Sequence, residues 1–101
     1  MKDIVQQALQ TALSLINSTN LSSIDDLEKS SANCYIDDNH YIFMTFGYKP
    51  DLTEIWLWFS IEHKDRGPYE DSLDEQDTAD LSSESITYNL KILLDRFNTQ
   101  A

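Results

Sequence analysis

The chain has 101 residues, which allows one domain with a single hydrophobic core. Hydrophobic residues make up 41% and aromatic residues 11% of it, and this composition excludes a disordered acidic tail. Eighteen acidic residues against seven basic ones give a formal net charge of -11, which disfavours direct binding to nucleic acid or to an anionic membrane.

The N-terminal segment predicts an amphipathic helix from Lys2 to Asn17, because its apolar residues recur at three- and four-residue spacing. Gln6, Gln7 and Gln10 interrupt it, so it does not have the apolar core of a signal peptide. No later stretch is long and apolar enough for a membrane span. We therefore expect a soluble cytoplasmic protein. The single cysteine, Cys34, fits a reducing compartment.

A second, short helix is predicted from Ile24 to about Ser30, where Ser23 and Asp26 form a start resembling a capping box. Strands follow. Residues 34–36 and 41–46 are rich in aromatic and branched side chains, and the polar residues 37–40 between them are typical of a hairpin turn.

The longest strand is predicted from Glu54 to His63. Its alternation divides the side chains between two faces. Ile55, Leu57, Phe59 and Ile61 point one way, and Trp56, Trp58, Ser60 and Glu62 point the other way. The short connections predict an antiparallel meander.

Residues 67–81 show no convincing hydrophobic period. Leu73 could begin a helical turn or a brief edge strand, but the carboxylates around it favour a loop. A last helix is predicted from Ser83 to Asn98, with apolar residues on one face and Arg96 in its final turn. The expected fold is a single α+β domain over residues 1–101. Both terminal helices would pack on one face of an antiparallel sheet of three to four strands.

Charge is concentrated in one part of the chain. Six carboxylates lie between Glu70 and Asp80 with no Lys or Arg among them, and residues 61–80 together carry -6. The first 20 and the last 21 residues are each neutral. This asymmetry predicts an electrostatic docking surface for a basic protein. The alternative is an acidic loop that is merely solvated.

The sheet face away from the helices would carry two tryptophans, and aromatic residues are enriched at binding hot spots. Alternatively, the segment from Asp65 to Leu81 or a self-dimer covers them. The candidate partner-binding residues combine the acidic run with these aromatics: Trp56, Trp58, Tyr69, Glu70, Asp71, Asp74, Glu75 and Asp77.

No catalytic constellation is recognisable. His40 and His63 fall in a predicted turn and at a strand end, and Cys34 is interpreted as a small buried residue. The aspartates at 71, 74, 77 and 80 lack the glycine and the terminal glutamate of a calcium loop. One cysteine and two separated histidines do not predict a zinc site. We expect no cofactor, no metal and no enzymatic activity.

In size, acidity, low glycine content and α+β order, the chain resembles immunity proteins of bacterial toxin systems, including contact-dependent growth inhibition. The resemblance rests on no shared motif, so it assigns no role to a numbered residue. It implies an inhibitor that occludes the basic cleft of a cognate toxin, with a nuclease as the expected partner.

Three alternatives remain. The chain also resembles acidic type III secretion chaperones, which bind an extended effector segment and dimerise. A phage-encoded nucleic-acid mimic would use the same carboxylates against a DNA-binding groove. A small enzyme is the third class, although no site signature supports it.

Overall fold

The computed structural model describes residues 3–65 and 74–100. In chain order, its elements are α1 (Ile4–Ser18), α2 (Ile24–Lys29), β1 (Ser31–Tyr35), β2 (His40–Tyr48), β3 (Ile55–His63), β4 (Asp74–Thr78) and α3 (Ser83–Gln100).

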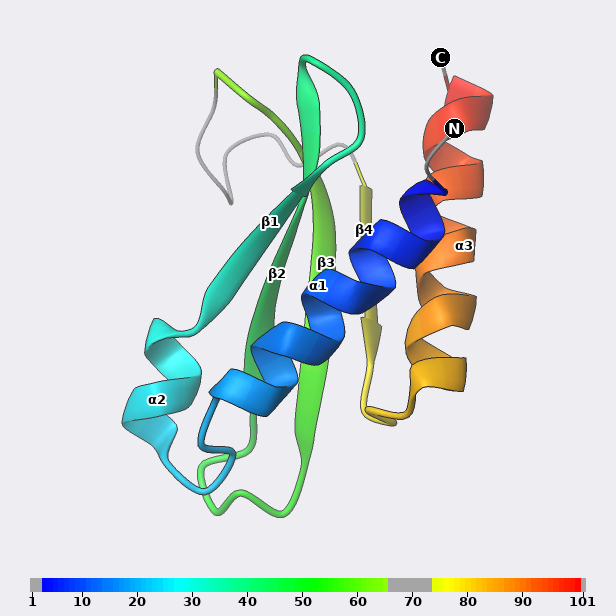
Figure 1. The fold of residues 1–101 in the computed structure, drawn as a ribbon. Helices are drawn as coiled ribbons and strands as arrows, with labels where there is room; N and C mark the ends of the chain where they lie inside the picture. Colours follow the sequence, from blue (N-terminus) through cyan, green and yellow to red (C-terminus); the bar gives the residue numbers. More distant parts are fainter. Residues whose placement is uncertain (1–2, 66–73, 101) are drawn as a thin grey trace.

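The four strands form one antiparallel sheet in the order β1-β2-β3-β4. Helices α1 and α3 lie on the same face of this sheet, and α3 runs beside β4 (Figure 1). The predicted α+β class, with an antiparallel sheet and both terminal helices on one side, is confirmed. Within the described ranges, no helix is long and apolar enough to cross a membrane.

The helices begin where the sequence supplies caps. Asp3 accepts a hydrogen bond from the backbone N–H of Val5 at the start of α1, and Ser23 accepts one from Asp26 at the start of α2. Such caps satisfy backbone donors that have no partner within the helix. The two helices therefore start within two residues of their predicted positions.

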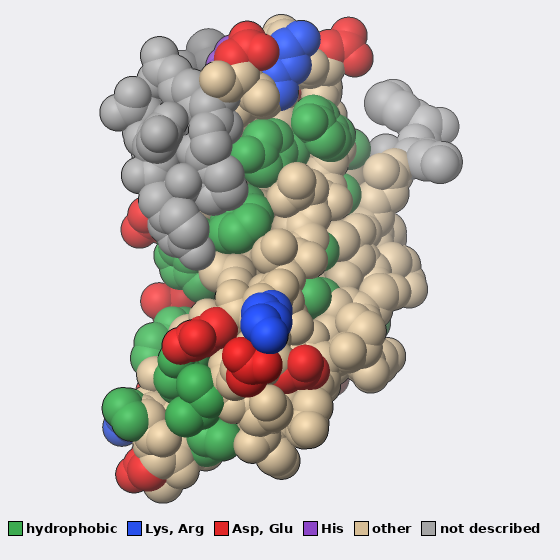
Figure 2. All heavy atoms as spheres, turned by 90° about the vertical axis from the view of Figure 1, so that its left-hand side faces the viewer, with side chains coloured by type: hydrophobic (Ala, Val, Ile, Leu, Met, Phe, Trp, Pro, Cys, Tyr) green, Lys and Arg blue, Asp and Glu red, His purple; other side chains and the backbone are tan. Residues whose placement is uncertain are grey.

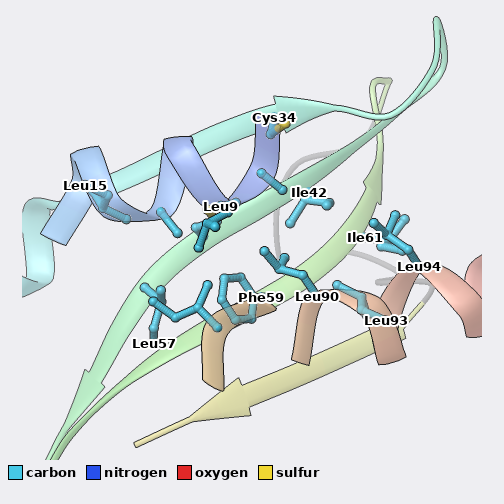
Figure 3. Close-up of a cluster of buried hydrophobic side chains, with 14 of the residues drawn as sticks. Leu9, Leu15, Cys34, Ile42, Leu57, Phe59, Ile61, Leu90, Leu93 and Leu94 are labelled. Carbon is cyan, nitrogen blue, oxygen red and sulfur yellow. The ribbon is translucent and has the colours of Figure 1, made fainter. Parts of the chain in front are cut away.

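The hydrophobic core lies between the sheet and the two long helices (Figure 3). Leu57, Phe59 and Ile61 of β3 are wholly buried there, and Leu90 and Leu93 of α3 are also wholly buried. Burying each such side chain contributes roughly 1.5–3 kcal/mol. The predicted inward face of the long strand is thus confirmed at its three central positions.

The main correction concerns residues 67–81, which were expected to form a loop. Residues 74–78 form the edge strand β4. Its helix-facing side chains are polar and bond to α3. The strand therefore lacks the alternation of apolar and polar residues from which a strand is predicted. Gln76 donates to Asn89 at 2.7 Å, and the hydroxyl of Thr78 lies 2.7 Å from that of Ser85.

Strand β1 is also shifted from its predicted place. It occupies Ser31–Tyr35 rather than residues 34–36. Ser31, Ala32 and Asn33 have weak strand propensity, but each pairs with a residue of β2. Sheet pairing therefore extends the strand beyond its aromatic end.

Candidate functional site

The register of the sheet brings tryptophans and carboxylates to one surface. Trp58 lies opposite Asp77 across the β3–β4 ladder, and Ser60 lies opposite Glu75. Because alternate strand residues share a face, Glu75 and Asp77 lie on the same side as Trp56 and Trp58, away from the helices. We call Trp56, Trp58, Glu75 and Asp77 the acidic–aromatic surface.

The carboxylates of this surface have no partner among the described residues. Glu75 and Asp77 are exposed, and no hydrogen bond or salt bridge of the described residues engages their side-chain oxygens. Three of the basic residues, in contrast, already pair with other acids. Lys29 pairs with Asp25, Lys49 with Glu54 and Arg96 with Asp74. The negative charge of Glu75 and Asp77 is therefore not neutralised by these ion pairs.

The two tryptophans are partly buried and held in place. The indole of Trp56 lies across Gly47, its partner on β2, so closely that a Cβ atom at Gly47 would overlap it. The ring of Trp58 packs edge-on against Phe43, with ring centroids 6.1 Å apart. Both indoles thus lie against β2, where a fixed ring loses little further entropy on binding.

Beside the tryptophans, four residues on the same face are buried: Tyr41, Phe43, Ser60 and Glu62. Ser60 hydrogen-bonds to a carboxylate oxygen of Glu62. Burial, and secondarily the charge of Glu62, raises the pKa of the Tyr41 phenol. Sequence reasoning did not name Tyr41 or Phe43 as part of this face, although the period of two along β2 could have found them.

Asp74, a predicted partner-binding residue, lies on the other face. It is opposite Ile61 in the register, and its carboxylate lies 3.0 Å from Nε of Arg96. Arg96 also donates to the backbone oxygen of Glu75 and to the side-chain oxygen of Gln76. The contacts of Asp74 therefore attach β4 to α3. Three other predicted residues, Tyr69, Glu70 and Asp71, lie outside the described residues.

The two histidines lie at one end of the sheet. His40 and His63 pair across β2 and β3 with ring centroids 5.3 Å apart, and the ring of Phe97 contacts His40. Nδ1 of His40 lies 2.9 Å from a carboxylate oxygen of Asp37. Among residues 3–65 and 74–100, no cluster of three or more His, Cys, Asp or Glu side chains could hold a metal ion.

Cys34 faces α1 in the core. Burial raises the pKa of its thiol, an effect only partly offset by a hydrogen bond with Thr11. Because the reactive form of cysteine is the thiolate, this environment disfavours a nucleophilic role.

No family model, curated protein or solved structure matches this chain. Functional inference therefore depends on the surface and its charges.

Proposed function

We propose that this protein is an inhibitor that binds a basic cleft of another protein through the acidic–aromatic surface, as immunity proteins do with toxins. The observation that carries the proposal is the juxtaposition of Trp58 with Asp77 and of its neighbour Ser60 with Glu75 across β3 and β4. This places an aromatic anchor beside exposed carboxylates. Neither Glu75 nor Asp77 is needed for a described side-chain contact within the chain.

The two kinds of side chain would act on different steps of binding. Exposed carboxylates in a chain of net charge -11 attract a basic partner over long range and raise the association rate. Partly buried aromatic rings become fully desolvated only in the complex, and they slow dissociation. A nuclease toxin is the partner class that we propose, because its phosphate-binding cleft is basic and is blocked when carboxylates occupy it.

Inhibition by occlusion requires no chemistry from this chain. We accordingly propose that it has no enzymatic activity, and that the toxin's substrate is excluded because the inhibitor fills the cleft. Seven basic residues among eighteen acidic ones argue against direct nucleic-acid binding. The expected compartment is the cytoplasm, where a cell would need protection from a nuclease.

The first test identifies the partner by affinity capture from the source organism and mass spectrometry. The captured protein should be a basic nuclease, and co-expression of the two proteins should restore the growth of cells that make the nuclease. An unfolded secretion substrate as the partner would instead support a chaperone. A DNA-binding host enzyme would support the nucleic-acid mimic.

The second test measures association by stopped-flow fluorescence. Glu75→Gln with Asp77→Asn should lower the association rate about tenfold at low salt. The matched control, Asp38→Asn with Asp95→Asn, removes two exposed charges elsewhere and should have a much smaller effect. Equal effects of the two pairs would mean that only net charge matters, and the docking surface would be rejected.

The third test addresses the anchor. Trp58→Ala should raise the dissociation rate roughly 30-fold or more, which corresponds to a hot spot of about 2 kcal/mol or above. Tyr88→Ala is the control, since Tyr88 is an exposed aromatic residue on α3. A dissociation rate that is unchanged in Trp58→Ala would place the contact elsewhere.

A further inference from the structure

The second edge strand, β1, presents backbone hydrogen-bonding groups in a regular row. The N–H of Ile36 donates to the carbonyl of His40, so this pair is hydrogen-bonded. In an antiparallel ladder, hydrogen-bonded and non-hydrogen-bonded pairs alternate. Ala32 and Cys34 therefore bond to β2, whereas the N–H and C=O groups of Ser31, Asn33 and Tyr35 point toward the outer edge.

Among residues 3–65 and 74–100, no strand pairs with this outer edge. Strand β1 ends the strand order of the sheet, and no hydrogen bond of the described residues uses the outward groups of Ser31, Asn33 or Tyr35. Two adjoining hollows of about 510 Å³ each lie between the strand and α1, and they share Gln10 and Thr11. Because consecutive β1 residues from both faces line them, the hollows follow the edge of the strand.

Charged side chains flank this strand at both ends, in α2 and at Asp37 and Asp38, but none lies within it. Neither α1 nor β1 contains an acidic or basic residue, although a quarter of the whole chain is charged. Figure 2, which views the molecule from the side of β1, shows an uncharged area between charged groups at the top and a cluster of basic and acidic side chains just below the middle. Edge strands are usually protected by charged side chains, and β1 lacks this protection.

We propose that two copies of this chain associate edge to edge through β1, in antiparallel register about a two-fold axis at Asn33. Asn33 then pairs with Asn33 of the other copy, and Ser31 pairs with Tyr35. The outward groups on alternate residues are in the positions that such a ladder requires. The two four-stranded sheets become one continuous sheet.

The symmetry of the edge argues for a second copy as its occupant, because the outward groups of Ser31, Asn33 and Tyr35 are arranged symmetrically about Asn33 and can pair with the same groups of another copy. Two molecules of net charge -11 repel each other, and the repulsion is least where each presents an uncharged surface. The exposed Gln6 and Gln10 of α1 border the same edge and offer amide donors and acceptors to the other copy. The contact is isologous, as a closed dimer requires.

The dimer is independent of the proposed inhibitory function. Strand β4 lies at the opposite edge of the sheet, so both acidic–aromatic surfaces stay open in the dimer.

Sedimentation equilibrium from about 1 μM to about 1 mM tests the association, across the range in which weak dimers form. The mass should rise toward twice 11.7 kDa as concentration increases. Added salt should strengthen the dimer, because it screens the mutual repulsion. A monomer throughout this range, at low and at high salt, would overturn the proposal.

Two substitutions at the axis locate the interface. Asn33→Pro removes the outward N–H but no hydrogen bond to β2, and Asn33→Glu places two carboxylates opposite each other. Both should yield monomers with an unchanged circular dichroism spectrum. Tyr88→Glu adds the same charge on α3 and should stay dimeric. Dimers that persist in both Asn33 variants would overturn the proposal.

Amide hydrogen exchange supplies a readout that does not depend on a variant. The amides of Ser31, Asn33 and Tyr35 should become protected as concentration rises, while those of Ala32 and Cys34 should already be protected in the monomer. Protection of the first three that does not change with concentration would refute the edge-to-edge ladder. Protection only after addition of another protein's extended segment would assign the edge to a different partner and would also refute the dimer.

Discussion

The two edge strands of this sheet have the same length but are attached to their helices by different interactions. Strand β1 places Ala32 and the buried Cys34 against α1 in a largely apolar contact, which includes a hydrogen bond between Cys34 and Thr11 but no ion pair. Strand β4 directs Asp74, Gln76 and Thr78 toward α3 and bonds through all three. One edge of the sheet is therefore neutral and the other is acidic, and the two binding surfaces that we propose should respond to salt in opposite ways.

Salt should separate the two surfaces experimentally. Binding of a basic partner at β4 should weaken as ionic strength rises, whereas self-association at β1 should strengthen. The following predictions concern how much individual residues of the core, of the sheet and of its edges contribute to stability, from the largest expected effect to the smallest.

Phe59 tests whether the two edges share one core. It is wholly buried on the central strand β3, in the core that also contains residues of α1 and α3. Phe59→Ala should lower the free energy of unfolding by about 3–5 kcal/mol, because it removes apolar burial and leaves a cavity. Urea denaturation would measure the loss. Separate unfolding transitions for the α1 side and the α3 side would show that the edges are independent units.

Gly47 supports the aromatic half of the acidic–aromatic surface. Gly47→Ala should lower the free energy of unfolding by about 1–3 kcal/mol, because the new methyl group overlaps the Trp56 indole and forces it to move. In a Trp58→Phe background, Trp56 is the only tryptophan, and Gly47→Ala should change its fluorescence emission. Unchanged emission together with unchanged stability would contradict the close contact.

Arg96 tests the polar attachment of β4. Arg96→Ala should lower the free energy of unfolding by about 1–2 kcal/mol, since it removes one partly buried ion pair and two hydrogen bonds. Amide exchange should accelerate in β4 but not in β1. Lys29→Ala is the control and should cost at most about 0.5 kcal/mol, because its ion pair with Asp25 is exposed.

Asp37, in the turn between β1 and β2, should have the smallest effect. The backbone N–H of Asn39, together with contacts to His40, holds the pKa of this carboxyl below its usual value. A lowered folded-state pKa stabilises the protein above the unfolded-state pKa, and the gain is lost as pH falls through the folded-state value. Acid unfolding below about pH 4 should therefore be slightly less steep in Asp37→Asn. An identical pH profile would show that Asp37 contributes nothing to the pH dependence of stability.

Sequence patterns predicted the elements that are stabilised by apolar burial and by local caps. Apolar residues recur at three- and four-residue spacing in α1 and α3 and alternate around Phe59. These apolar faces are buried best when they share one core. The positions of Glu75 and Asp77 could not be predicted in the same way. Strand β4 buries polar groups against α3, and such contacts depend on partners that are distant in sequence.

The sequence by itself determined the α+β class, the two long helices, the direction of the Trp56 and Trp58 side chains and the concentration of negative charge in residues 61–80. The tertiary structure decided which carboxylates share a face with the tryptophans, because strand register assigns Asp74 to Arg96 and leaves Glu75 and Asp77 beside Trp58. It also decided that the uncharged strand lies at an edge. Charge and periodicity are local properties of a chain, whereas register and edge position arise only when strands pair.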